Sequence, residues 1–370
     1  MVGAVGGSGY VRTPMEPATV PFVQGADDLT VDWCNAALGP ALAGGRVVAV
    51  TTQPVGTGQV ADTVRLQLTY DDAGTGGPAT LVAKVPAADE TSRAGARFSR
   101  TYEIEASFYR DLAPILPVRT PYCHYAAHDP STDAYVVLLE DVAPARQGDQ
   151  MRGCPLSDIE AAIDEMVLLH GPRWGDPTLR QLGWLHRASP EATAGTIALI
   201  QYAVEPFREH YTDRLDADTL ALLDRFVPHL DSYLRHRPEP WTIVHGDFRA
   251  DNLLFGGDRV VVVDWQTVGL GPGPSDLAYL LGASVTPDVR AANEAALVAR
   301  YVAGLTALGV VVDGDDLWTQ YRRFAFGGLV MAIVASALVQ RTDRGDEMFV
   351  TMAVRHARQA LDLDSEALLT

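Results

Sequence analysis

The periodicity of the apolar residues changes once along the 370-residue chain, near Glu140, and this change constrains the fold most strongly. Before Glu140, apolar and polar residues alternate in short runs, a pattern typical of half-buried strands. After Glu140, apolar residues recur every three or four positions over long stretches, which is typical of helices. A chain of this length suits two domains or one two-lobed unit. We therefore expect an α+β protein in which a small β-rich lobe precedes a larger helical lobe.

The first part of the chain predicts a five-stranded antiparallel sheet with one helix. In the clearest strand, the apolar side chains from Val64 to Tyr70 share one face and the polar side chains share the other. In the helix, apolar residues follow one another at four-residue spacing. The predicted strands are Arg46–Gln53, Val60–Tyr70, Thr80–Val85, Tyr122–Ala127 and Ala134–Leu139, and the predicted helix is Arg97–Leu112.

The second part predicts a mostly helical lobe. Ser157 followed by Glu160 has the spacing of a capping box, which would begin its first helix. A single hairpin, Asn252–Phe255 with Val260–Asp264, interrupts the helices. The predicted helices are Ser157–His170, Pro190–Tyr211, Ala217–His236, Asp288–Leu308, Asp315–Val339 and Asp346–Leu361.

These patterns divide the chain into three segments. Residues 1–25 are rich in Gly, Pro and Ser, so we expect a flexible N-terminal segment. Residues 26–140 form the small lobe and residues 141–370 the large lobe. The two lobes would meet in a cleft.

The composition limits the classes of partner. The formal net charge is −18, which repels nucleic acid and anionic membranes, so we expect neither as a partner. The charge suits solubility first and a cationic substrate second. The three cysteines have no metal-ligand spacing and fit a reduced, cytoplasmic setting. We expect no signal peptide, and the longest apolar run, Gly327–Val339, is too short to span a bilayer and predicts a buried helix.

The strongest local signal is HGDFRADN, which contains Asp247 and Asn252, followed by the apolar strand VVVVDW that ends at Asp264. Phosphoryl transfer needs a carboxylate that orients the attacking hydroxyl, with metal ligands beside it. Magnesium prefers hard oxygen ligands and usually takes one or two carboxylates. The spacing predicts Asp247 as the base and Asn252 with Asp264 as the ligands. By itself, HxDxxxxN is more often an ordinary polar turn, and the Asp264 strand favours the functional interpretation.

A glycine-containing turn joins the first two predicted strands at Gly56, Thr57, Gly58 and Gln59. Glycines let backbone N–H groups approach phosphate oxygens closely. A plain hairpin explains the same residues at least as well when the turn is taken alone.

Lys84 stands on an apolar strand between Ala83 and Val85. A lysine there is costly unless its ammonium is paired or faces a cleft, although an edge strand facing water is an equally good interpretation. If Lys84 is functional, its partner is a carboxylate on the following helix. Glu105 lies at the edge of the apolar face of that helix, so we choose Glu105 and keep Glu103 as the alternative.

The apolar strand that begins at Tyr135 runs through Leu139 and Glu140 to Asp141, at the boundary between the lobes. The backbone there could hydrogen-bond to a nucleotide base, although the strand alone is simply part of a core. Asp276, in GPGPSDLAYLL, caps a helix or braces the catalytic loop, and we assign it no chemistry.

In this order, these segments resemble the aminoglycoside phosphotransferase and choline-kinase-like superfamily, from about Val47 to about Leu361. HGDFRADNLLF, VVVVDWQTVGLGPGPSDLAYLL and LHGPRWGDP look especially like its bacterial phosphotransferase branch. That branch is related to ecdysteroid kinase-like proteins and to the kinase domains attached to some acyl-CoA dehydrogenases. The resemblance implies a protein-kinase-like two-lobed fold, Mg²⁺ with ATP or GTP as co-substrate, and transfer to a hydroxyl of a small molecule.

Matched residue by residue, the resemblance implies the same roles for Asp247, Asn252 and Asp264. It implies that Lys84, oriented by Glu105, binds the α- and β-phosphates.

The same resemblance implies that the turn from Gly56 to Gln59 covers the phosphates. The segment Leu139, Glu140, Asp141 and Val142 would hold the adenine ring, and His245 would brace the catalytic loop.

Two departures bear on the acceptor. The metal strand ends in DWQ, and Asp276 follows Trp265 by only eleven positions, too few for a protein-kinase activation segment. We therefore do not expect protein substrates. The acceptor could be an antibiotic, an aminoglycoside-like compound or another metabolite, or alternatively a hydroxyacyl thioester. A catalytically silent nucleotide-binding scaffold is the second hypothesis, although no catalytic position is missing.

Overall fold

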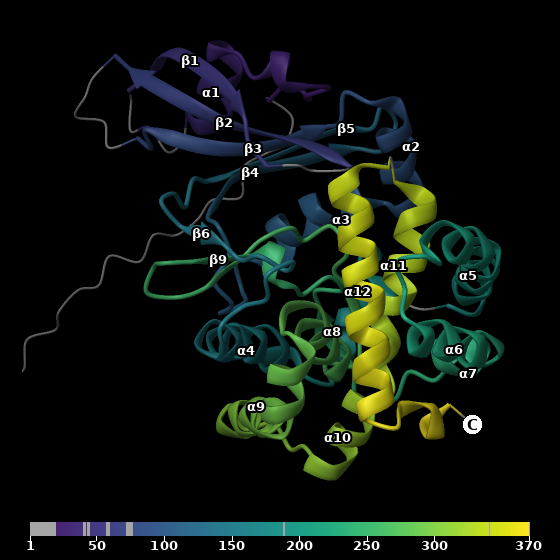
Figure 1. The fold of residues 1–370 in the computed structure, drawn as a ribbon. Coiled ribbons are helices and arrows are strands. Elements are labelled where there is room, and N and C mark those ends of the chain that lie inside the picture. Colours follow the sequence, from purple (N-terminus) through teal and green to yellow (C-terminus); the bar gives the residue numbers. More distant parts are fainter. Residues whose placement is uncertain are drawn as a thin grey trace, which may run out of the picture.

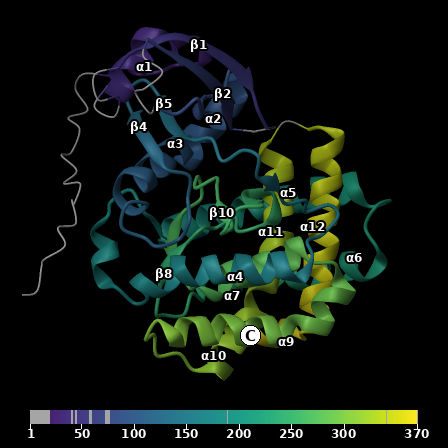
Figure 2. The same ribbon diagram turned by 90° about the vertical axis from the view of Figure 1, so that its left-hand side faces the viewer.

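The protein folds into two lobes, which lie one above the other in the computed structural model (Figure 1, Figure 2). The small lobe holds a β-sheet and the large lobe is mostly helical, so the predicted α+β, two-lobed architecture is confirmed. The structure describes residues 20–39, 42, 45–56, 60–71, 77–187, 189–339 and 341–369. Residues 1–19 of the segment expected to be flexible lie outside this range. Val20 and Val23, from the same segment, are buried in the small lobe.

The small lobe contains the predicted five-stranded antiparallel sheet. Its spatial order is β1-β2-β3-β5-β4. Along β3, Leu81, Ala83 and Val85 are fully buried on one face, so alternation sends Lys84 to the opposite face. The strands are β1 (Val47–Pro54), β2 (Ala61–Tyr70), β3 (Thr80–Pro86), β4 (Cys123–Asp129) and β5 (Ala134–Glu140).

The face of the sheet opposite Lys84 is covered by a helix that the sequence analysis missed, α1 (Val31–Leu38). The Thr30 hydroxyl caps this helix by accepting a hydrogen bond from the Trp33 backbone N–H (3.2 Å). Trp33 and Leu38 pack in one buried cluster with Leu66 of β2. The signal was present in the sequence as a threonine cap before an apolar i, i+4 pattern.

The single helix predicted over Arg97–Leu112 is wrong in its bounds. The structure has α2 (Glu90–Ser99) and α3 (Thr101–Ser107), and the latter continues as a π-helical turn over Phe108–Leu112. The break falls at Arg100, whose φ of 57° is left-handed and ends an α-helix. One non-glycine residue in the left-handed conformation does not change the apolar periodicity, so the pattern did not predict the break.

The large lobe is built from nine labelled helices within the described residues. Two predicted helices are each divided. Ala217–His236 is broken by a 3₁₀ turn at Val227–His229, and Asp315–Val339 by one at Phe324–Phe326. The helices are α4 (Leu156–His170), α5 (Pro190–Tyr211), α6 (Ala217–Phe226), α7 (Leu230–Arg235), α8 (Pro274–Ser284), α9 (Pro287–Ala307), α10 (Gly314–Arg323), α11 (Gly327–Leu338) and α12 (Asp343–Asp362).

The predicted capping box of α4 is wrong. The helix starts at Leu156 after Pro155, and no side chain caps its N-terminus by a hydrogen bond. The segment Gly314–Leu338 has the length and composition of a membrane span, with half of its most apolar window buried. In the structure this segment is α10 and α11, and Leu329 and Ile333 of α11 lie fully buried in the large-lobe core.

Short strands deliver the loops that carry the predicted catalytic residues. The predicted hairpin is confirmed as β9 (Leu253–Phe255) and β10 (Val261–Val262), and β6 (Arg146–Gln147) joins it as a third strand. A second small sheet, which the sequence analysis missed, consists of β7 (His186–Arg187), β8 (Thr242–Val244) and β11 (Gly269–Gly271). The loop with the predicted base, which we call the catalytic loop, runs from β8 to β9, and the loop that carries Asp264 runs from β10 to β11.

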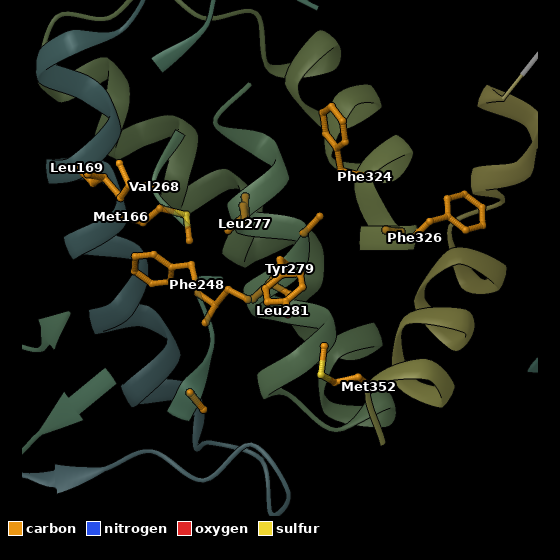
Figure 3. Close-up of a cluster of buried hydrophobic side chains, with 14 of the residues drawn as sticks. Met166, Leu169, Phe248, Val268, Leu277, Tyr279, Leu281, Phe324, Phe326 and Met352 are labelled. Atoms are coloured by element: carbon orange, nitrogen blue, oxygen red, sulfur yellow. The ribbon is translucent and has the colours of Figure 1, made fainter. Parts of the chain in front are cut away.

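The catalytic loop is anchored in the hydrophobic core of the large lobe (Figure 3). Phe248, from that loop, is fully buried and lies among side chains of α4 and α8, including Met166 and Leu277. Burying a phenylalanine stabilises a fold by about 2–3 kcal/mol, enough to fix the loop against the helices. The polar residues on either side of Phe248 are therefore held in one position.

Candidate active site

The start of the catalytic loop is held by Asp276, at the beginning of α8. Its carboxylate accepts hydrogen bonds from the backbone N–H groups of His245 (2.6 Å) and Gly246 (3.0 Å). Its side chain makes no helix-capping bond, so of the two predicted alternatives the structure favours loop bracing. Gly246 has a φ of +81°, and a Cβ there would lie 2.6 Å from the Thr267 carbonyl oxygen. Only glycine allows this approach between the two loops.

His245 joins the catalytic loop to the Asp264 loop. Its Nδ1 accepts a hydrogen bond from the Asp247 backbone N–H (3.2 Å), so Nε2 carries the proton and donates to the Val263 carbonyl (3.0 Å). The ring is fully buried. The resemblance implied a bracing role for His245, and these contacts fit that role.

The Asp247 carboxylate lies between two donors. Arg249 Nε donates to both of its oxygens (3.0 Å each), and Asn252 Nδ2 donates to Oδ2 (2.9 Å). Asn252 Nδ2 also donates to the Asp247 carbonyl (2.8 Å). Asp247 and Asn252 are thus neighbours, as the HxDxxxxN spacing predicts.

Lys84 lies between two carboxylates. Its Nζ donates to Glu105 Oε1 (2.8 Å) and to Asp264 Oδ1 (2.7 Å), although 180 residues separate Lys84 from Asp264. The expected partner, Glu105, is therefore the one that pairs. Glu103, the alternative, instead pairs with Arg100 at the surface.

The electrostatics of this group keep Lys84 and Asp264 charged, as their ion pair requires. Burial by itself lowers the pKa of the Lys84 ammonium, but the Asp264 and Glu105 carboxylates outweigh it and raise that pKa above its usual value. Burial by itself raises the pKa of the Asp264 carboxyl, but Lys84 outweighs it and holds that pKa below its usual value. The ion pair therefore persists at neutral pH.

Glu105 is fully buried and has two further donors. The Tyr135 hydroxyl donates to Oε2 (2.5 Å), and the Trp265 backbone N–H donates to Oε1 (3.3 Å). Burial, and then the Glu105 charge, raise the pKa of Tyr135 well above its usual value, so its hydroxyl stays a donor. Burying a carboxylate costs free energy unless hydrogen-bond donors reach its oxygens, as Lys84, Tyr135 and Trp265 do here.

The backbone at Asp264 bends out of the strand. Asp264 has a φ of 67°, in the left-handed region that aspartate tolerates better than most residues. The next side chain, Trp265, is buried and stacks on Phe108, with ring centroids 3.9 Å apart and an interplanar angle of 9°. This bend and stack leave the Asp264 side chain 37% exposed beside Lys84.

The Asp247–Asn252 pair and Asp264 lie on adjoining backbone segments. The Val263 N–H donates to the Asn252 carbonyl (3.0 Å), and Asp264 follows Val263 directly. The structure therefore brings Lys84 and Glu105 from the small lobe next to the large-lobe residues predicted with them.

The segment expected to hold a nucleotide base connects β5 to the large lobe. The Glu140 carboxylate accepts two bonds from Arg119 Nη2 (2.9 Å each), and the Asp141 carboxylate accepts from Arg65 Nε (2.7 Å). Because Arg65 and Arg119 occupy both carboxylates, a base would contact the backbone of residues 139–142, where the Glu140 N–H already donates to the Tyr122 carbonyl (2.8 Å).

The predicted phosphate-covering turn is described only at its first residue. Gly56 has a φ of +75°, a conformation that L side chains rarely adopt. Thr57, Gly58 and Gln59 lie outside the described residues.

Sequence reasoning missed the residues that support the site. Arg249 contacts Asp247, and Tyr135 contacts Glu105. Arg65 and Arg119 hold the segment of residues 139–142, which we call the hinge. Arg249 alone had a signal, because it stands two positions after Asp247 inside the motif.

Comparison with known proteins decides the family. Residues 51–316 match the phosphotransferase enzyme family, which is well over half of the chain. The chain belongs to the phosphotransferase enzyme family. Phosphoryl transfer is therefore its reaction class, and the predicted resemblance is confirmed.

Solved structures support the fold of this phosphotransferase. The GDP complex of wild-type aminoglycoside 2'-phosphotransferase-IIIa is 15% identical, with 87% of this chain and 96% of that chain covered and a TM-score of 0.52. Choline kinase from Cryptosporidium parvum is 8% identical, with 86% and 90% covered and a TM-score of 0.50. A Ralstonia eutropha protein assigned to the aminoglycoside phosphotransferases is 18% identical, with 88% and 96% covered and a TM-score of 0.52.

One curated relative has a related segment. Over 67 residues, the phosphotransferase is 34% identical to acyl-CoA dehydrogenase family member 10 from Mus musculus. The match covers 17% of this chain and 6% of that protein. The chain therefore spans a small part of the mouse relative.

Proposed function

We propose that this phosphotransferase moves the γ-phosphate of a magnesium-bound nucleotide, ATP or GTP, to a hydroxyl of a small molecule. One observation carries the proposal: the Lys84 ammonium lies 2.8 Å from Glu105 and 2.7 Å from Asp264, and Val263, the residue before Asp264, donates its N–H to the Asn252 carbonyl (3.0 Å). A cation, two candidate oxygen ligands and, through the contact of Asn252 with Asp247, a candidate base thus lie on neighbouring segments, which supports the proposal. Phosphoryl transfer depends on that combination.

The residues present fit a magnesium ion. Asn252 uses its amide nitrogen on Asp247, and no described residue donates a hydrogen bond to its amide oxygen. Asp264 Oδ2 likewise accepts no hydrogen bond from the described part of the chain. These two oxygens make Asn252 and Asp264 the proposed ligands. When bound, Mg²⁺ would neutralise charge on the phosphates.

Lys84 would bind the α- and β-phosphates, because its ammonium points at Asp264 from the small-lobe side. Glu105, from α3 of the small lobe, fixes the direction of the lysine. The turn at Gly56 would cover the phosphates, and the backbone from Leu139 to Val142 would bind the base. The solved aminoglycoside 2'-phosphotransferase-IIIa, which shares the fold, binds GDP.

Asp247 would orient the acceptor hydroxyl and accept its proton. Its carboxylate is 18% exposed, so a substrate can reach it, and Asn252 holds one of its oxygens. Candidate acceptors are antibiotics, aminoglycoside-like compounds and other metabolites, with hydroxyacyl thioesters as the alternative. We propose a cytoplasmic setting for this chemistry.

The test is nucleotide consumption by the purified protein against a panel of antibiotics, amino alcohols, sugars and hydroxyacyl thioesters. At least one acceptor should raise consumption and appear as a phosphate monoester by mass spectrometry. Asp247→Ala should still bind Mg-ADP but transfer phosphate about 10²–10⁴-fold more slowly. Asp258→Asn, at the exposed turn between β9 and β10, is the matched control and should match the parent.

Two results would count against this proposal. Nucleotide binding without turnover across the whole panel would favour a silent scaffold. Near-parental transfer by Asp247→Ala would mean that another group activates the hydroxyl.

A further inference from the structure

Arg249 contacts the proposed base more closely than any other cation among the described residues. Its Nε lies 3.0 Å from each oxygen of Asp247, centred between them. The terminal torsion of an aspartate is broad, so its carboxylate needs outside contacts to stay in one orientation. Arg249 and Asn252 supply those contacts from two directions.

Arg249 is itself held in place by two acceptors. Its Nη1 donates to Gln150 Oε1 (2.9 Å) and to Asp251 Oδ2 (3.1 Å). The Gln150 backbone N–H donates in turn to Asp251 Oδ1 (2.9 Å). Burial by itself lowers the pKa of Arg249, but Asp247 and the other nearby groups outweigh it and raise that pKa, so the guanidinium stays charged.

These contacts continue to helix α12. Arg355 Nη1 donates to the Gln150 carbonyl (2.6 Å), and its Nη2 donates to the Met151 carbonyl (2.9 Å). Met348, two turns earlier on α12, places its sulfur 3.6 Å from Arg249 Nη1. A continuous set of hydrogen bonds therefore joins α12, the loop at Gln150 and the catalytic loop.

From these contacts, we infer that Arg249 is a positioning residue for Asp247, and that Gln150 acts on the base through Arg249. The inference rests on the proposed function, because it concerns the alignment of the carboxylate that would meet the acceptor hydroxyl. The guanidinium is planar and its N–H directions are fixed, so it orients a carboxylate better than an ammonium does.

A purely structural role makes a different prediction. If Arg249 only ties the Gln150 loop to the catalytic loop, its loss lowers stability and leaves the rate of the folded protein unchanged. A positioning role lowers kcat while the affinity for Mg-ADP is kept, because small misalignment of a reacting group can cost about 100-fold in rate.

The experiment compares variants for kcat and KM with the acceptor found in the panel, for Mg-ADP affinity by calorimetry, and for Tm. Arg249→Gln should lower kcat about 100-fold with Mg-ADP affinity within threefold of the parent. Arg249→Lys keeps the charge and should recover about tenfold of that loss, and it remains informative if the glutamine variant folds poorly. The control is Arg225→Gln, which removes a surface ion pair between α6 and Glu366, near the C-terminal end of the described residues.

A double-mutant cycle tests whether Gln150 acts through Arg249. Gln150→Leu should lower kcat about tenfold in the parent. It should lower kcat less than twofold when Arg249 is already glutamine, because the residue through which it acts is gone.

The outcomes separate this inference from the proposed function. Absence of turnover by the parent on every acceptor overturns the proposed function. If the parent turns over and the kcat of Arg249→Gln is within threefold of the parental value, only the positioning role is overturned. Independent, additive losses from the two substitutions remove Gln150 from the inference and leave Arg249.

Discussion

Lys84 is the only lysine in the sequence, and every other basic side chain among the 29 lysines and arginines is an arginine. Arginine serves the surface ion pairs of this protein, such as Arg225 with Glu366. The compact ammonium is kept at the position where it fits between Glu105 and Asp264. Arginine and lysine differ in shape and hydration, so this distribution fits a specific role for Lys84.

Lys84→Met should both destabilise the protein and slow phosphoryl transfer. It leaves the buried Glu105 carboxylate without its cation, and breaking a buried ion pair costs about 3 kcal/mol. The transfer rate should fall at least about 100-fold, as expected when a charge-stabilising group is removed. Denaturant unfolding and the phosphotransfer assay measure the two effects.

Lys84→Arg is the matched variant, since it keeps the positive charge. It should keep most of the stability and lose most of the rate, because the wider guanidinium cannot replace the ammonium at the phosphates. Parental transfer by Lys84→Met would show that Lys84 has no role at the nucleotide.

Individual site residues were predictable where their chemistry depends on spacing or alternation. Asp247 and Asn252 belong to one local motif, and Lys84 conflicts with the apolar strand around it. The structure places each of these side chains next to its expected partner. Tyr135 acts from another element, and no sequence pattern links it to Glu105. Such contacts depend on tertiary packing, which periodicity does not encode.

At the scale of elements, α12 packs closely on α8 and α11 because one glycine on each of those helices makes room for a histidine of α12. His356 of α12 is fully buried and donates a hydrogen bond from Nδ1 to the Ala325 carbonyl (2.9 Å). A Cβ at Gly328 would lie 2.0 Å from the His356 ring, and one at Gly282 of α8 would lie 2.3 Å from it. The ring therefore occupies the space that two side chains would otherwise fill.

Gly328→Ala should destabilise the protein by about 1–3 kcal/mol, because overpacking forces the helices apart. The neighbouring Gly327→Ala is the control, since its Cβ would meet only ordinary contacts at 3.6 and 3.8 Å. That variant should be neutral or gain up to about 1 kcal/mol from helix propensity. Urea unfolding of both variants measures the difference, and equal stabilities would mean that α11 and α12 adjust freely.

The type and order of the elements were predicted better than their ends. The five strands and most helices follow strong apolar periods, which a chain must satisfy to bury its core. The breaks at Arg100 and at Phe324–Phe326 were missed, because apolar spacing continues across them. The short strands β7, β8 and β11 were missed because strands of two or three residues have no measurable period.

At the scale of the whole molecule, the site exists only because the lobes meet. Arg119 shows how they are joined, because its side chain donates to Glu140 at the hinge. Its backbone N–H donates to Glu165 of α4, and its carbonyl accepts from the Val262 N–H. One residue thus ties the connecting segment to both the helices and the strand before Asp264. The relative position of the lobes could not be predicted from local patterns, since it depends on contacts of this kind.

The acidic surface belongs to the same scale. A net charge of −18 gives the protein an acidic surface, while Lys84, the cation that we propose binds phosphate, is enclosed between the lobes. The electrostatic field at the surface therefore does not predict the charge at the site, so the acceptor is identified by assay.

The single lysine makes the central claim directly measurable. An amine-reactive acyl-phosphate derivative of ATP should modify Lys84 and, apart from the α-amino group, no other position, as read by peptide mass spectrometry. Excess Mg-ATP should suppress that modification, and removal of the metal by EDTA should weaken the protection. Modification of Lys84 that is unaffected by Mg-ATP, or modification confined to the α-amino group, would contradict a nucleotide site built around Lys84.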